Sequence, residues 1–192
     1  MSEHHDHSHA VVTEENSKKL MVALGLTTTF LIVEVVAAFI TQSLALLSDA
    51  AHMFTDVAAL AIALAAIKIG KKAADDKRTF GYQRFEILAA LFNAVMLFVV
   101  AIYIVYEAYQ RFTNPAEIQS VGMMIVAVIG LVINLISMKI LSASAEGSLN
   151  IKGAYLEVLS DALGSIGVII GGIVIYFTQW MWVDTVIAVL IG

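Results

Sequence analysis

Long apolar segments separated by short polar ones dominate the pattern of this chain. The apolar segments cover residues 20–40, 44–69, 85–109, 120–141, 153–177 and 181–192. About 20 mostly apolar residues allow a helix to cross the hydrocarbon core of a bilayer, and no segment alternates with the period of a barrel strand. The pattern therefore predicts an all-α membrane protein, a bundle of six transmembrane helices of which the sixth is incomplete.

The composition supports a membrane protein and limits the metal ligands that are available. Of the 192 residues 60% are hydrophobic and 14% are charged, whereas soluble domains average about 45 to 50% and about 25%. Because the chain has no cysteine, any metal must be held by His, Asp, Glu or backbone oxygen. The net charge of -5 gives no support to nucleic-acid binding.

The distribution of basic residues predicts the orientation of the chain. Ten of the eleven Lys and Arg residues lie in or beside the N-terminal segment and the loops after the second and fourth spans, and Arg111 is the exception. Basic loops remain on the cytoplasmic side of a membrane. We therefore expect the N-terminus to be cytoplasmic.

Residues 1–19 form a polar, histidine-rich tail ahead of the transmembrane domain, which we assign to residues 20–192. The tail contains His4, His5, His7 and His9. These side chains could collect metal at the cytoplasmic mouth, and a solvated tail without that role is the alternative.

The second and fifth spans carry closely spaced sets of ionisable side chains, and each charge costs at least about 2.5 to 3.5 kcal/mol at the bilayer centre. The second span contains Asp49, His52 and Asp56, and their spacing puts them on one helical face. The fifth span contains Glu157 and Asp161, again four residues apart. From the rise of a helix we expect the two sets within about 5 Å of the same depth. We predict a metal site of His52, Asp56, Glu157 and Asp161, with Asp49 either an accessory ligand or a structural residue.

The charge of these four groups indicates what they bind. With the histidine neutral they carry three negative charges, which a low-dielectric core cannot hold without a divalent cation or protons. Imidazole together with carboxylates in a set of four favours a tetrahedral transition metal such as Zn²⁺ over Mg²⁺ or Ca²⁺. Since ligands must lose protons to bind metal, the site suits an exchange of metal for protons.

Other interpretations of the polar residues and of the protein stay open. A lone acid in a span is more often a paired structural group, and a buried amide more often makes an interhelical hydrogen bond than assists the path of the metal. The acids concerned are Glu34, Glu86, Glu107 and Asp184, and the amides are Asn93 and Asn134. For the whole protein, a metal-permeable channel would use the same ligands without proton movement. A non-transporting membrane scaffold would need none of them.

Three motifs resemble those of the cation diffusion facilitators, with the bacterial cobalt-zinc-cadmium resistance type the nearest likeness. They are Ser48–Asp56 (SDAAHMFTD), Phe80–Glu86 (FGYQRFE) and Gly153–Asp161 (GAYLEVLSD), in order along almost the whole chain. The resemblance implies a secondary active transporter, not an enzyme, that exports Zn²⁺, with Cd²⁺ and Co²⁺ as further candidates, in exchange for H⁺. It further implies a homodimer in the bacterial inner (cytoplasmic) membrane, a metal that is substrate and not a prosthetic group, and a transport site of His52, Asp56, Glu157 and Asp161.

The chain departs from the family pattern in three places. Position 157 is Glu where zinc-selective relatives commonly have His, which makes the site more anionic. In the loop after the second span Arg78 and Tyr82 stand where some relatives have metal ligands, so we predict no site there despite Asp75 and Asp76. The family usually continues into a cytoplasmic domain after the sixth span, and we expect that domain to be absent from this chain.

Overall fold

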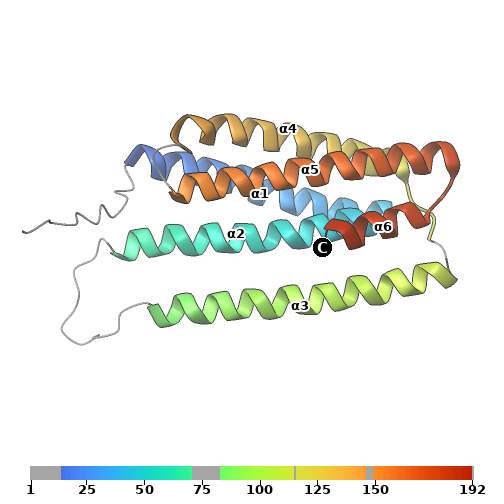
Figure 1. Ribbon diagram of the computed structural model, residues 1–192, viewed down its shortest axis with the longest axis horizontal. Coiled ribbons are helices and arrows are strands. Elements are labelled where there is room, and N and C mark those ends of the chain that lie inside the picture. The colour runs from blue at the N-terminus through green and yellow to red at the C-terminus, as the bar shows by residue number, and fades with distance from the viewer. Residues whose placement is uncertain (1–13, 71–82, 115, 146–148, 192) are drawn as a thin grey trace, which may run out of the picture.

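The protein is a bundle of helices that run side by side along its long axis (Figure 1). The computed structural model describes residues 14–70, 83–114, 116–145 and 149–191, which contain helices and no strand. The helices are α1 (Glu14–Thr41), α2 (Leu44–Gly70), α3 (Gln83–Thr113), α4 (Ser120–Ala145), α5 (Leu149–Thr178) and α6 (Trp182–Ile191). The prediction of an all-α membrane bundle is confirmed. Within the described residues α1, α3, α4 and α5 are long and apolar enough to cross a membrane, and the count of six spans stays a prediction.

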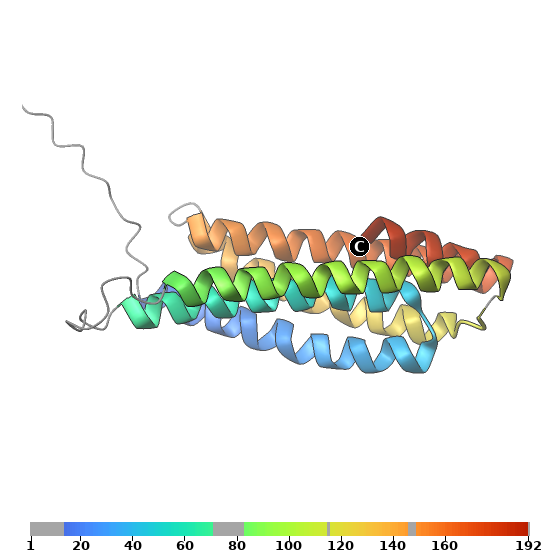
Figure 2. The ribbon, with the colours of Figure 1, turned by 90° about the horizontal axis from the view of Figure 1, so that it is seen from below.

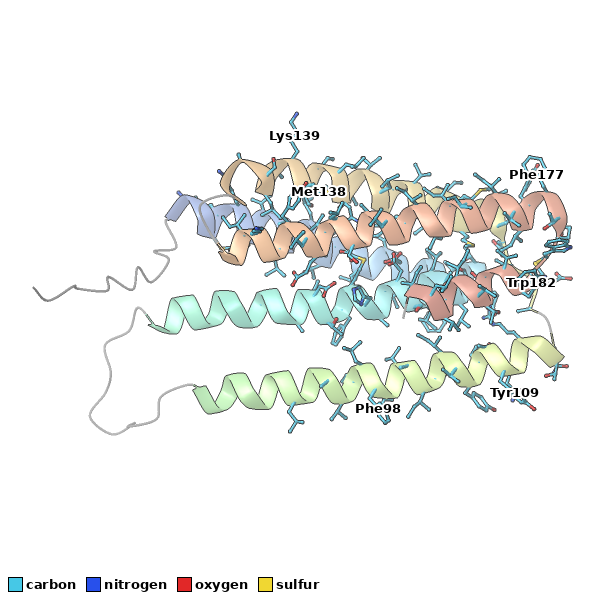
Figure 3. The ribbon with its side chains drawn as sticks, in the orientation of Figure 1. Phe98, Tyr109, Met138, Lys139, Phe177 and Trp182 are labelled. Carbon is cyan, nitrogen blue, oxygen red and sulfur yellow. The ribbon has the colours of Figure 1, made fainter. Side chains whose placement is uncertain are left out.

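The outer surface of the bundle is apolar, as a surface in contact with lipid requires. Figure 3 shows Phe98 and Tyr109 of α3 and Phe177 of α5 pointing away from the neighbouring helices. The exposed fraction of the Phe177 side chain reaches 78%. Helix α3 lies at the lower edge of the bundle in Figure 1 and nearest the viewer in Figure 2, and it packs against α2 and α6. The interior is formed mainly by α1, α2, α4 and α5.

Small residues set the distances between the central helices. Helix α4 packs along α5 at Gly172, where a Cβ atom would overlap Met124. It packs along α1 at Gly130, where a Cβ would lie 2.5 Å from Cζ of Phe30. Small residues let helix backbones approach closely inside membranes. Helix α4 therefore packs closely against both α1 and α5.

Replacing Gly130 by alanine should destabilise the bundle by about 1 to 3 kcal/mol, the usual cost of overpacking a filled core. Phe30 is fully buried, so its ring cannot move aside freely. Thermal unfolding of the purified protein in detergent measures the loss. Gly25→Ala is the matched control because a Cβ there meets nothing within 4 Å, and it should leave the melting temperature unchanged or raise it. Equal melting temperatures for Gly130→Ala and the wild type would contradict the packing described.

The turn between α1 and α2 is short and satisfies its backbone groups locally. Gln42 adopts a left-handed conformation (φ 57°), and the amide of Ser43 donates to the carbonyl of Ala38, as in a Schellman helix end. Ser43 then caps α2, because its Oγ accepts a hydrogen bond from the amide of Leu46 at 3.1 Å. The turn therefore fixes the start of α2, the helix that contains Asp49, His52 and Asp56.

A buried carboxylate from α6 completes this end of α2. Asp184 is 0% exposed and accepts hydrogen bonds from Ser43 Oγ and the amide of Leu44, both at 2.6 Å, and from the amide of Ala45 at 3.2 Å. A negative charge is favourable beside the unpaired amides of a helix N-terminus. Helix α6 thereby holds the start of α2.

Arg111 supplies the counter-charge of this carboxylate from the end of α3. Its Nη1 donates to Oδ2 of Asp184 at 3.2 Å and to the carbonyl of Gln42 at 2.9 Å, while Nε donates to Oε1 of Glu107 at 3.1 Å. This is the one basic residue that the charge distribution placed apart from the others. Asp184 is thus a paired structural acid that joins α2, α3 and α6.

Candidate metal centre

Three of the predicted site residues come together between α2 and α5. His52, Asp56 and Asp161 each offer one ligand atom, and these atoms lie within 4.8 Å of one another. On α2, His52 Nε2 and Asp56 Oδ2 are 3.8 Å apart, as expected for residues one helical turn apart. Asp161 approaches them from α5. One ion at the centre of this set could contact all three side chains.

The carboxylates of this set are short of partners. Oδ2 of Asp56 and Oδ1 of Asp161 are buried and accept no hydrogen bond from the described residues. The Asp161 side chain lies in the core, with the residue 2% exposed. A buried polar atom without a partner is costly, and a buried charge more so. The arrangement therefore suits a site that a cation or protons complete.

Gly164 sets the register of α5 against α2. A Cβ atom at Gly164 would lie 3.0 Å from Oδ1 of Asp49, so the two helices meet closely at this level. His52 follows Asp49 by three residues on α2, and Asp161 precedes Gly164 by three residues on α5. Because the two helices are antiparallel, both steps run in the same direction along the bundle. The close contact thus explains why these two residues lie at the same depth.

A cavity connects the metal centre with the space between α2, α5 and α6. Its volume is about 360 Å³. It is lined by Asp49, His52 and Asp161 and by residues near the end of α6, among them Ile187 and Leu190. The His52 side chain lines this cavity, and 43% of it is exposed. An ion could therefore reach the three clustered side chains from the cavity.

Glu157 and Asp49 lie beside the cluster and not within it. Glu157 is half-buried on α5, one turn from Asp161, and its carboxylate is not among the atoms that gather within 4.8 Å. Asp49 is buried one turn from His52 toward the α1–α2 turn. Its place in the cavity wall fits either of the roles considered for it. Glu157 stays a predicted fourth ligand.

Several sequence predictions fall outside the described residues. These are the tail histidines His4, His5, His7 and His9, and the loop positions Asp75, Asp76, Arg78 and Tyr82. The side chains of Glu86 and Asn93 are likewise outside the part of the chain that can be described. Their predicted roles stay predictions.

Two further buried polar residues were named from the sequence without a link to the site. Glu34 of α1 lies against Asp49, with Oε2 buried and without a partner. Asn134 of α4 is 1% exposed, and neither its Oδ1 nor its Nδ2 has a hydrogen-bond partner. Glu34 is the one charged residue of residues 20–40 and Asn134 the one amide of residues 120–141, so no spacing within its own span links either to the site. Only the packing of α1 and α4 brings them near α2 and α5.

The fold and this cluster define a helical membrane protein with a candidate cation site between α2 and α5. Comparison with known proteins gives the family. The model of the cation efflux transmembrane domain matches residues 20–192. The chain belongs to the cation efflux family, the cation diffusion facilitators, as its motifs predicted.

The chain resembles several bacterial relatives over nearly its full length. It is 64% identical to the metal cation efflux system protein CzcD of Cupriavidus metallidurans over 98% of the chain and 58% of that protein. It is 44% identical to the cadmium, cobalt and zinc/H⁺-K⁺ antiporter of Bacillus velezensis over 98% of the chain and 60% of that protein. It is 42% identical to the zinc transporter ZitB of Escherichia coli over 98% and 61%. The chain thus spans about three fifths of the length of these relatives.

Proposed function

We propose that the protein is a proton-coupled antiporter that exports a divalent transition metal from the cytoplasm, with Zn²⁺ as its main substrate. The metal binds between His52, Asp56 and Asp161, and Glu157 joins them as the fourth ligand when metal is present. Protons take the place of the metal when it leaves, because the same oxygen and nitrogen atoms bind either. The protein works in the bacterial inner membrane as a homodimer, with its N-terminus in the cytoplasm.

The observation that carries this proposal is the cluster of His52, Asp56 and Asp161 with its unpartnered oxygens. A structural acid in this protein looks different, since Asp184 accepts several hydrogen bonds and has an arginine beside it. In the clustered acids, Oδ2 of Asp56 and Oδ1 of Asp161 have no such partner among the described residues. Intramembrane acids of this kind mark ion pathways.

The names of the relatives support the class of substrate. CzcD is named a metal cation efflux protein, ZitB a zinc transporter, and the Bacillus velezensis relative an antiporter of cadmium, cobalt and zinc with H⁺ and K⁺. Transfer of these activities to the present chain is part of the proposal. The chemistry of imidazole and carboxylate ligands fits the same metals.

Vesicles reconstituted with the chain test this function. One vesicle preparation contains a zinc-sensitive dye and a second contains a pH dye. Zinc is added outside both, and the dyes report zinc entry and proton movement. We expect zinc entry together with proton movement in the opposite direction. Zinc entry without proton movement would indicate the channel considered from the sequence, and the absence of any zinc flux would indicate a scaffold.

Glu157→His should raise the preference for zinc over cadmium, on the order of tenfold or about 1.4 kcal/mol in relative binding. Imidazole offers one nitrogen and suits four-coordinate zinc, whereas a carboxylate can bind through both oxygens and so accommodate a larger ion. Competition between the two metals in the vesicle assay measures the ratio. Glu157→Gln is the control, because it removes the charge without supplying imidazole, and it should not favour zinc. An unchanged ratio in Glu157→His would refute the role of this position.

A further inference from the structure

Helix α4 contributes a side chain at the depth of the metal centre. Asn134 is 1% exposed, and both polar atoms of its amide lack a hydrogen-bond partner among the described residues. A buried amide is normally satisfied, so an unpartnered one calls for a partner that joins it in another state of the protein. The helix that packs most extensively against α4 is α5, which contributes Asp161 to the cluster.

The packing of α4 on α5 gives the residue that Asn134 faces. Met124 lies against Gly172 at one end of the interface, and Leu141 clusters with Ala154 at the other. The helices are antiparallel, so ten residues beyond Met124 on α4 correspond to about ten or eleven residues before Gly172 on α5. Asn134 therefore lies opposite Asp161 or its neighbour Ala162.

Asn134 is also on the correct face of α4. It is eleven residues after Met123, which contacts Gly171, and seven residues before Leu141, which packs in the cluster formed with α5. Residues seven or eleven apart share a helical face. The amide is thus directed into the bundle, on the face of α4 that meets α5 and, one turn earlier at Gly130, Phe30 of α1.

We propose that Asn134 is a positioning residue of the transport site, whose Nδ2–H group donates a hydrogen bond to Oδ1 of Asp161 when metal is bound. This inference rests on the proposed function. Oδ1 of Asp161 is buried and lacks a partner, and the amide supplies the donor that a ligating carboxylate needs. A hydrogen bond to the oxygen of a metal ligand orients that ligand, and loss of such a partner typically lowers metal affinity about 10- to 100-fold.

Zinc binding to the purified full chain tests the assignment. Isothermal titration with zinc chloride should give a Kd about 10- to 100-fold weaker for Asn134→Leu, which keeps the volume and removes the amide. Asn134→Ala removes the amide without adding bulk and should weaken binding to a similar extent if the leucine variant does not fold. The melting temperature of the metal-free protein should not fall for the leucine variant, whereas a purely structural amide would lower it and leave the Kd unchanged.

Ser137→Ala is the matched control. Ser137 is buried one turn further along the same face of α4, and its Oγ also lacks a partner. The control should bind zinc within twofold of the wild type. A Kd within twofold of the wild type for both Asn134 variants, or an equal loss in Ser137→Ala, would overturn the assignment.

Asp161→Ala separates this proposal from the proposed function. If Asp161→Ala loses zinc binding while the Asn134 variants keep it, the role of Asn134 fails and the transport site stands. If the wild type binds no zinc, or if Asp161→Ala binds zinc as well as the wild type does, the transport site fails and the role of Asn134 fails with it.

Discussion

Replacing Asp161 by alanine should abolish zinc transport driven by a pH gradient, with a loss greater than about 100-fold. The carboxylate is the contribution of α5 to the three clustered side chains, and without it α2 alone would hold the ion. Loss of a residue that only supports a metal ligand already costs about 10- to 100-fold, so loss of the ligand should cost more. Uptake into proteoliposomes with a zinc-sensitive dye inside measures the effect.

Ser165→Ala is the control for this prediction, because Ser165 is equally buried one turn away on α5 and is not in the cluster. It should transport zinc at a rate near that of the wild type. Asp56→Ala should behave like Asp161→Ala, since both residues contribute to the same set. Transport by either aspartate variant at half the wild-type rate or more would show that this set does not carry the metal.

Asp184→Ala should destabilise the protein by about 3 to 5 kcal/mol, as is typical when one partner of a buried ion pair is removed. The substitution leaves the hydroxyl of Ser43 and two backbone amides at the start of α2 without their acceptor, and it removes one of the two carboxylates beside the guanidinium of Arg111. Thermal or denaturant-induced unfolding in detergent measures the loss. Its effect on metal binding should be indirect, since Asp184 is not in the metal cluster.

The other acid beside Arg111 provides the comparison. Glu107 pairs with the same guanidinium but is partly solvated, with 29% of its side chain exposed. Exposed ion pairs contribute about 0 to 1 kcal/mol, so Glu107→Ala should cost no more than that. Equal stability losses for Asp184→Ala and Glu107→Ala would contradict the role given to Asp184.

The helices and part of the site were predictable because they depend only on the order of residues within single segments of the chain. Apolar segments of sufficient length predict helices that cross a membrane. The four-residue spacing of His52 and Asp56 places both on one face of α2 whatever the other helices do. The rise per residue then gave the depth at which Asp161 would meet them, and the close contact at Gly164 agrees with that depth.

The remaining features depend on which helices touch, and a single sequence does not contain that information. Asp184 lies about 140 residues from the amides that it binds, so nothing local distinguished it from a ligand. The buried polar neighbour of Asn134 on its helix face is Ser137, a serine that does not by itself indicate a metal site. Glu157 satisfies the same spacing rule as Asp56 and yet lies outside the cluster, because spacing places a side chain on a helical face but does not bring it within reach of a common point.

The central claim is that metal and protons compete for His52, Asp56 and Asp161. Proton release on zinc binding tests it most directly, with the purified chain in a weakly buffered solution that contains a pH dye. Zinc should release protons from the wild-type protein, because the ligands must be deprotonated to bind metal, and Asp161→Ala should release far fewer. Zinc binding without proton release, or equal release from the wild type and Asp161→Ala, would contradict the account.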